Sequence, residues 1–138
     1  MQIKFKILLF LLVAGTVTHA QKVQQYKQVS PNKIAVNNTL SQKLLQQIKK
    51  GDAYLFDVRT PAEYNAGHLQ YAQNLSIQSA DFGGQVKRLD KNKFIYLYSH
   101  SGNRSGKATD SLLLLGYKKS YNIGGLDSLE KAGFTIVK

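Results

Sequence analysis

Cysteine is absent from the 138-residue sequence, and acidic residues are few. Without cysteine the chain cannot form a disulfide scaffold, a thiolate nucleophile, a persulfide, an iron–sulfur cluster or a cysteine zinc site. Only 8 Asp and Glu accompany 19 Lys and Arg, so the formal net charge is +11. This excess indicates an anionic partner or surface, but charge alone does not identify it.

Other negative features narrow the choice of partners and cofactors. The lysines are scattered, and no dense basic run interleaved with aromatic residues indicates nucleic-acid binding. The histidines His19, His68 and His100 lack the spacing of metal ligands, so neither a metal nor another cofactor is expected. Hydrophobic residues make up 43% of the chain, which together with its length predicts one folded domain.

The first 20 residues have the layout of a secretory signal peptide. Lys4 and Lys6 precede an uncharged apolar run at residues 7–15, and Ala20 supplies a small residue before the expected cut. The run is shorter than the roughly 18–20 residues that span a bilayer, and no cysteine follows the cut to carry a lipid. We therefore expect an exported protein, periplasmic or secreted, with no stable membrane anchor after cleavage.

The remaining sequence alternates strand and helix signals. Residues 21–38 are polar and form a segment leading into the domain, with a short strand at 26–29 or 34–36. From residue 39 onward, short apolar runs alternate with amphipathic stretches, which predicts an α/β domain with a parallel sheet covered on both faces. The expected strands are residues 53–58, 73–75, 94–98 and 120–123. The expected helices are residues 39–50, 60–67, 79–90 and 106–115, with a small one near the C-terminus.

Local signals mark the ends of two of these helices. Thr39 begins a capping box, and Gly51 fits the stop of the same helix. Thr60 is the expected cap of the next helix, with Pro61 in its first turn and Glu63 closing the box.

The loop that follows the strand at residues 94–98 is the expected functional site. In open α/β sheets, ligands bind beyond the carboxyl ends of strands, against helix N-termini. Small residues and Gly102 allow backbone N–H groups to converge as an anion-binding nest, and Arg104 adds a planar cation. An ordinary helix-capping loop is the alternative. The candidate ligand-binding residues are Ser99, His100, Ser101, Gly102, Asn103, Arg104 and Ser105.

Two separated segments resemble the rhodanese (sulfurtransferase) domain family. Residues 55–69, LFDVRTPAEYNAGHL, are similar to the family's D-V-R-x-x-x-E-Y-x-x-G-H-I segment, and residues 98–105, YSHSGNRS, to its active loop Y-C-x-S-G-N-R-S. A weaker likeness runs from Gly116 to Leu126. The resemblance implies a single rhodanese-like domain at residues 39–138, with a central five-stranded parallel sheet and helices on both faces.

The resemblance places Ser99 where the family has its catalytic cysteine. Family members attack a sulfur donor with the loop thiolate and hold the transferred sulfur as a persulfide. Serine cannot store sulfane sulfur, and its hydroxyl is scarcely ionised near neutral pH without a strong base. We therefore expect a pseudoenzyme that binds a small oxyanion or sulfur-containing ligand at this loop, as a binding or regulatory module. A partner protein is a further candidate.

Two other interpretations of Ser99 stay open. In the first, the chain is an active enzyme whose Ser99 serves an altered reaction, such as hydrolysis of a phosphate or sulfate ester. In the second, serine is a change from a natural cysteine in a thiosulfate sulfurtransferase-like enzyme.

Four residues of the first segment are expected to support the loop. Asp57 and Arg59 would orient it and pair with Arg104 or Glu63. His68 is expected to be a packed, hydrogen-bonded residue without a catalytic role.

Overall fold

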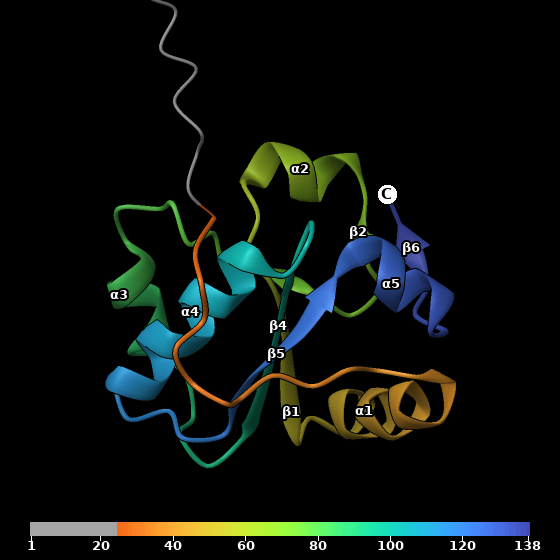
Figure 1. Cartoon of the computed structure of the whole chain (residues 1–138), viewed down its shortest axis with the longest axis horizontal. Coiled ribbons are helices and arrows are strands. Elements are labelled where there is room, and N and C mark those ends of the chain that lie inside the picture. The colour runs from red at the N-terminus through yellow and green to blue at the C-terminus, as the bar shows by residue number, and fades with distance from the viewer. Residues whose placement is uncertain (1–24) are drawn as a thin grey trace, which may run out of the picture.

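A computed structural model describes residues 25–138 as a parallel sheet between two layers of helices (Figure 1). The predicted signal peptide at residues 1–20 lies outside the described residues. The helices are α1 (Asn38–Lys50), α2 (Pro61–Ala66), α3 (Phe82–Val86), α4 (Asn103–Leu114) and α5 (Leu126–Lys131). The strands are β1 (Ala53–Asp57), β2 (His68–Leu69), β3 (Gln73–Asn74), β4 (Phe94–Ser99), β5 (Ser120–Gly125) and β6 (Ile136–Val137).

The main sheet has the strand order β3-β1-β4-β5, and every neighbouring pair is parallel. β4 lies between two neighbours and is almost wholly buried, which explains its continuous run of apolar and aromatic residues. Parallel pairing brings the carboxyl ends of all four strands to one end of the sheet, where the loop after β4 lies. The predicted α/β class is therefore confirmed.

Two hydrophobic clusters hold the helices on opposite faces of the sheet. On one face, Leu44 of α1 and Leu129 of α5 pack with Tyr96 of β4. On the other face, Leu112 of α4 packs with Leu97 of β4, and α3 contributes to the same cluster. Neighbouring strand residues point to opposite faces, so each strand serves both clusters.

The position expected for a fifth strand carries only one residue of pairing. Lys33 forms an isolated parallel bridge with Asn122 of β5, so the main sheet of residues 25–138 has four strands where five were expected. We call residues 25–36 the N-terminal strap. It pairs only here because its preceding residues turn onto α4, where Asp110 accepts the Val29 and Ser30 N–H groups at 2.7 and 3.0 Å.

Several element boundaries differ from the sequence prediction. α1 is capped by Asn37, whose side chain accepts the Leu40 N–H at 2.8 Å, so the expected cap at Thr39 was wrong by two residues. α4 begins at Asn103, three residues before the predicted start. β6 was not predicted, and it pairs antiparallel with β2 beside α5. No helix within residues 25–138 is long and apolar enough to cross a membrane.

Candidate functional site

The loop between β4 and α4 makes its turn through glycine. Gly102 precedes α4 with φ = 91°, a left-handed conformation that favours glycine. The loop is also packed closely against the end of β5. A Cβ atom built on Gly125 would lie 2.5 Å from the carbonyl oxygen of His100, so a side chain there would displace the loop. The second glycine of the Gly124–Gly125 pair therefore sets the distance between β5 and the loop.

Ser99 is the last residue of β4, and its hydroxyl is buried beneath the loop. Its Oγ accepts the N–H of Gly102 at 3.1 Å and the N–H of Ser105 at 3.2 Å. Two backbone donors therefore converge on Ser99 Oγ. The family that the loop sequence resembles has the sulfur of its catalytic cysteine at this position. Both N–H groups donate to a neutral hydroxyl of the protein itself, and binding of an anion by the loop stays a prediction.

The Ser99 hydroxyl is connected by hydrogen bonds to the side-chain amide of Asn122 and not to a general base. Ser105 Oγ donates to Asn122 Oδ1 at 2.8 Å, and because a hydroxyl carries one hydrogen, Ser99 must be the donor in its 3.0 Å bond with Ser105. The proton of Ser99 is thus directed through Ser105 to an amide oxygen that cannot take it. A nucleophilic serine needs an adjacent general base, and no histidine or carboxylate among residues 25–138 bonds to Ser99.

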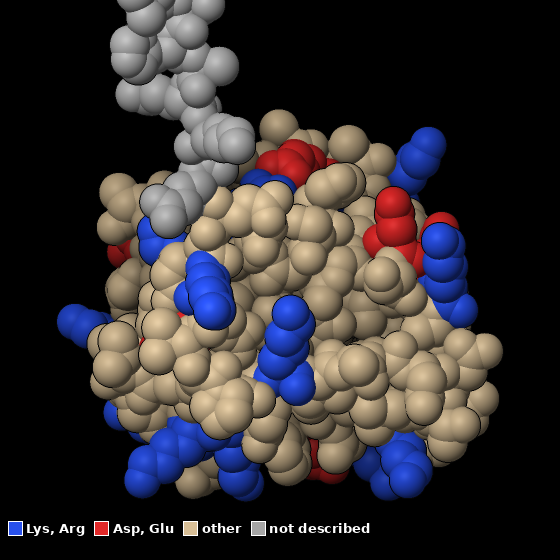
Figure 2. All heavy atoms as spheres, in the orientation of Figure 1, with Lys and Arg blue, Asp and Glu red and all other residues tan. Residues whose placement is uncertain are grey.

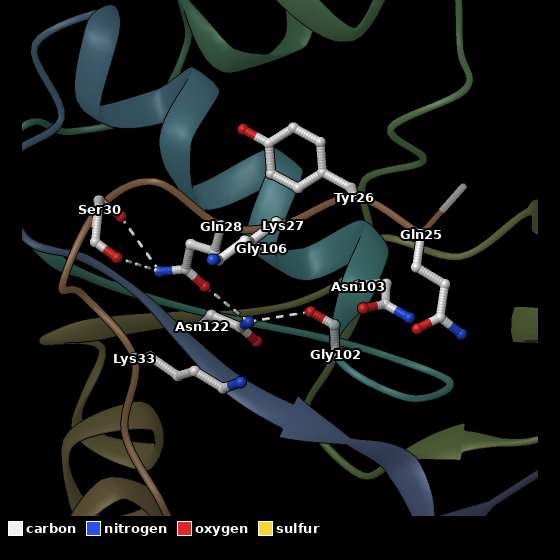
Figure 3. Close-up of a pocket in the computed structure, with 10 residues that line it drawn as sticks. All are labelled: Gln25, Tyr26, Lys27, Gln28, Ser30, Lys33, Gly102, Asn103, Gly106 and Asn122. Atoms are coloured by element: carbon white, nitrogen blue, oxygen red, sulfur yellow. Dashed lines mark hydrogen bonds between the residues drawn. The ribbon is translucent and has the colours of Figure 1, made fainter.

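Asn122 connects the loop to the N-terminal strap, and sequence reasoning missed it (Figure 3). Its Nδ2 donates to the Gly102 carbonyl and to Gln28 Oε1, both at 2.9 Å, and its Oδ1 accepts the Gly124 N–H at 3.0 Å. The side chain is buried with all of these groups paired. An asparagine inside a predicted buried strand was the available signal, because a buried amide must find partners.

Arg104, the predicted cation of the nest, is paired with a carboxylate. Its Nη1 and Nη2 donate to the two oxygens of Glu63 at 2.6 and 2.8 Å. These bonds and those from Thr60 outweigh the effect of burial and lower the pKa of Glu63 to about 2. Glu63 stays ionised at neutral pH and offsets the charge of Arg104, so the cation of the nest is balanced before any ligand arrives.

The other predicted ion pair joins different partners from those expected. Asp57 pairs with Arg59, at 2.7 Å between Nη2 and Oδ2, and not with Arg104. Asp57 also accepts the hydroxyl of Tyr98 at 2.8 Å, and burial raises the pKa of that phenol far above its usual value. Arg59 further donates to the Gly67 carbonyl at 2.6 Å. This buried cluster joins the end of β1 to β4 and to Gly67, the residue after α2. That it supports the loop stays a prediction.

The two histidines of the described region lie apart from the chemistry of Ser99. His68 stacks on Tyr64 with ring centroids 3.8 Å apart, and its Nδ1 lies 2.9 Å from the Tyr64 carbonyl oxygen. His100 is exposed on the loop. Within residues 25–138, no group of three or more histidine, aspartate or glutamate side chains could hold a metal ion.

The loop has backbone donors without acceptors among the described residues, and a polar cavity lies next to Gly102 and Asn103. The N–H groups of Ser101, Asn103 and Arg104 have no acceptor among residues 25–138. A cavity of about 480 Å³ lies between the loop and the strap, and Lys27 and Lys33 contribute to its lining with Asn103 (Figure 3). Neither lysine forms an ion pair with a described carboxylate. Free N–H groups at a helix N-terminus with lysines nearby favour an anion.

Comparison with known proteins identifies the family and the fold. The model of the rhodanese-like domain matches residues 40–132, about two thirds of the sequence. The chain belongs to the rhodanese-like domain family. This confirms the expectation from residues 55–69 and 98–105, and the rhodanese-like domain carries serine at the loop position where the family pattern has cysteine.

Individual relatives show how far the likeness extends. The rhodanese-like domain is 33% identical over 73 residues to thiosulfate sulfurtransferase PspE of Escherichia coli, covering 53% of this chain and 70% of that protein. It is 35% identical over 104 residues to an uncharacterized protein, slr1261, of Synechocystis, covering 74% of this chain but only 57% of the relative. Among solved structures it resembles one described as rhodanese with anions from E. coli, with a TM-score of 0.53, 30% identity and coverage of 62% and 98%.

Proposed function

We propose that this chain is an exported rhodanese-like domain that binds a small oxyanion or sulfur-containing anion at residues 99–105 and does not transfer sulfur. The observation that carries the proposal is the intact nest around Ser99. Two amide N–H groups converge on its Oγ, and three more along the loop have no acceptor among the described residues. Backbone N–H groups arranged in this way bind anions without needing a nucleophile.

Sulfur transfer lacks its chemical carrier. PspE of Escherichia coli, a relative that is 33% identical over 73 residues, is named a thiosulfate sulfurtransferase. Carrying sulfane sulfur requires a thiolate, whereas Ser99 offers a neutral hydroxyl whose proton is directed to Asn122 through Ser105. The proposal therefore separates binding, which the loop amides support, from transfer, which needs an atom that serine lacks.

The charges around the loop set the expected strength of binding. Arg104 is paired with Glu63, and Arg59 is paired with Asp57. These two ion pairs together carry no net charge. Attraction for an anion then comes from the N–H groups and from Lys27 and Lys33 beside the cavity. Dissolved salt screens the attraction between exposed lysines and an anion, so the affinity for the anion should fall as salt is added. The solved relative described as rhodanese with anions supports an anion as the ligand class.

Calorimetry of the protein with thiosulfate, sulfite, sulfate and phosphate at low ionic strength tests the proposal. We expect at least one of these anions to bind. Arg104→Ala should weaken binding about tenfold or more, because Glu63 is then left unpaired beside the loop. Glu63→Gln should strengthen it, since Arg104 is released. Lys131→Ala, an exposed change on α5, is the control and should have no effect. Absence of binding to all four anions would overturn the proposal.

A further inference from the structure

Most of the excess positive charge of residues 25–138 lies at the end of the sheet opposite the loop at residues 99–105. Parallel pairing gathers the connections that enter β1, β4 and β5 at one end. We call residues 49–52, 87–93 and 116–119 the basic end. It holds eight basic side chains and only two acidic ones, Asp52 and Asp90. The basic residues are Lys49, Lys50, Lys87, Arg88, Lys91, Lys93, Lys118 and Lys119.

The clustering of these basic side chains cannot be recognised from the sequence, in which the lysines are scattered. Residues 25–138 contain 16 basic and 8 acidic side chains, so their excess is eight, and the basic end accounts for six of it. Figure 2 shows Lys and Arg side chains projecting along the lower edge of the molecule, below the strands seen in Figure 1. The fold therefore makes one charged surface from three separate segments.

The cations of the basic end have no carboxylate partners in the described structure. Both ion pairs found within residues 25–138 belong to the other end, at Asp57 and Glu63. Four lysines of the basic end instead lie over aromatic rings. The ring-centroid distances are 5.6 Å for Lys49 over Tyr71, 5.2 Å for Lys91 over Tyr117, 5.3 Å for Lys93 over Tyr54 and 5.0 Å for Lys119 over Phe94. These contacts position the charges without neutralising them.

An exposed tyrosine and a cavity lie beside these cations. Tyr71 is 48% exposed and has φ = 71°, the only positive φ of a non-glycine residue in the described chain. It occupies a turn closed by the Ala72 N–H and the Leu69 carbonyl at 3.0 Å, where glycine would fit without strain. A cavity of about 300 Å³ is lined by Tyr71, Tyr54 and Lys93 among others.

We propose that the basic end is a docking surface for an anionic phospholipid bilayer. Each lysine or arginine near such a surface strengthens binding, and tyrosine rings favour the interface between water and lipid. Single-stranded nucleic acid is less well matched, because it needs exposed ring faces for base stacking, and four rings here lie under lysines. Docking through this end leaves the loop at residues 99–105 facing away from the membrane.

Co-sedimentation with vesicles tests the proposal. The protein, as residues 21–138, is mixed with vesicles of phosphatidylglycerol and phosphatidylcholine, and separately with phosphatidylcholine alone. We expect binding only to the anionic vesicles, and release as salt rises above about 0.1 M. Changing Lys87, Lys91, Lys118 and Lys119 to glutamine should weaken binding more than about 100-fold, at about fivefold for each charge.

Two controls separate docking from net charge and from misfolding. Changing Lys43, Lys107, Lys131 and Lys138 to glutamine removes the same charge outside the basic end, and it should weaken binding far less. Tyr71→Gly should reduce vesicle binding without lowering the thermal unfolding midpoint, because glycine accepts the positive φ. Equal losses in the two quadruple variants, binding to neutral vesicles, or tight binding to an oligonucleotide with none to vesicles would each overturn the proposal.

Discussion

Replacing Ser99 with cysteine tests whether the nest still fits a thiolate. A sulfur at this position would receive the N–H groups of Gly102 and Ser105, which now lie 3.1 and 3.2 Å from the serine Oγ. A hydrogen bond to a charged acceptor contributes about 1 kcal/mol more than one to a neutral acceptor, so two favour the thiolate by about 2 kcal/mol. At about 1.4 kcal/mol for each unit, they lower the pKa by roughly 1.5 units.

The expected pKa of the new thiol is therefore about 7, compared with about 8.5 for a free cysteine. Thiolate absorbance near 240 nm measures it directly, even for a buried group. No other thiol contributes to the absorbance, because the sequence has no other cysteine. Ser101→Cys is the matched control, since that residue is exposed on the same loop and should titrate near 8.5.

Two results decide the matter. A Ser99→Cys thiol that titrates at or above 8.5 in a folded protein would refute the reasoning, because the loop donors would then not favour negative charge at that atom. With a lowered pKa, the variant should also form some thiocyanate from thiosulfate and cyanide, whereas the Ser101→Cys control should form none. Serine at position 99 would then be the single change that separates the present loop from a sulfur-transferring one.

Three further predictions concern stability and follow from buried contacts. Asn122→Leu should lower the free energy of unfolding by about 2–4 kcal/mol, measured with urea, because the Gly102 carbonyl and the Ser105 hydroxyl lose their partner; an unchanged midpoint would contradict this. Asp110 has a pKa lowered to about 2 by hydrogen bonds from Ser30, Val29 and Tyr26 that outweigh its burial. Its contribution, about 2 kcal/mol, is present above the unfolded value of 3.8 and is lost as the pH falls toward 2, so Asp110→Asn should flatten the stability profile between pH 5 and 2; an unaltered profile would argue against it. Gly125→Ala should displace the loop and abolish anion binding in calorimetry while the main sheet remains, and retained affinity would show that the loop tolerates the shift.

The parts of the fold set by local patterns were predictable from the sequence. The run at residues 94–98 predicted β4, and Gly51 ends α1 in the left-handed conformation expected of a stop. Features that depend on distant segments were not. Lys33 forms one bridge in place of a strand because the strap is drawn onto Asp110, which lies about 80 residues away.

In the candidate site, too, features set by the local sequence were predictable and contacts between distant segments were not. Its position and its amide donors followed from the loop sequence and its likeness to a family. The pairing of its charges did not, because Glu63 reaches Arg104 across 41 residues while Asp57 takes its own neighbour Arg59. Asn122 was missed for a related reason, since its partners Gln28 and Ser105 lie 94 and 17 residues before it in the sequence.

The bond between Gln28 and Asn122 has a consequence for the order in which the protein matures. These residues are 94 positions apart, and Tyr26 meets Asp110 across 84. During synthesis the strap emerges before β5 and cannot form its bond to Asn122 until β5 has been made. The loop therefore acquires its full set of contacts only after the chain has been made as far as Asn122 of β5. A growing chain should remain without a completed ligand site, and ligand affinity should arise late and cooperatively in refolding.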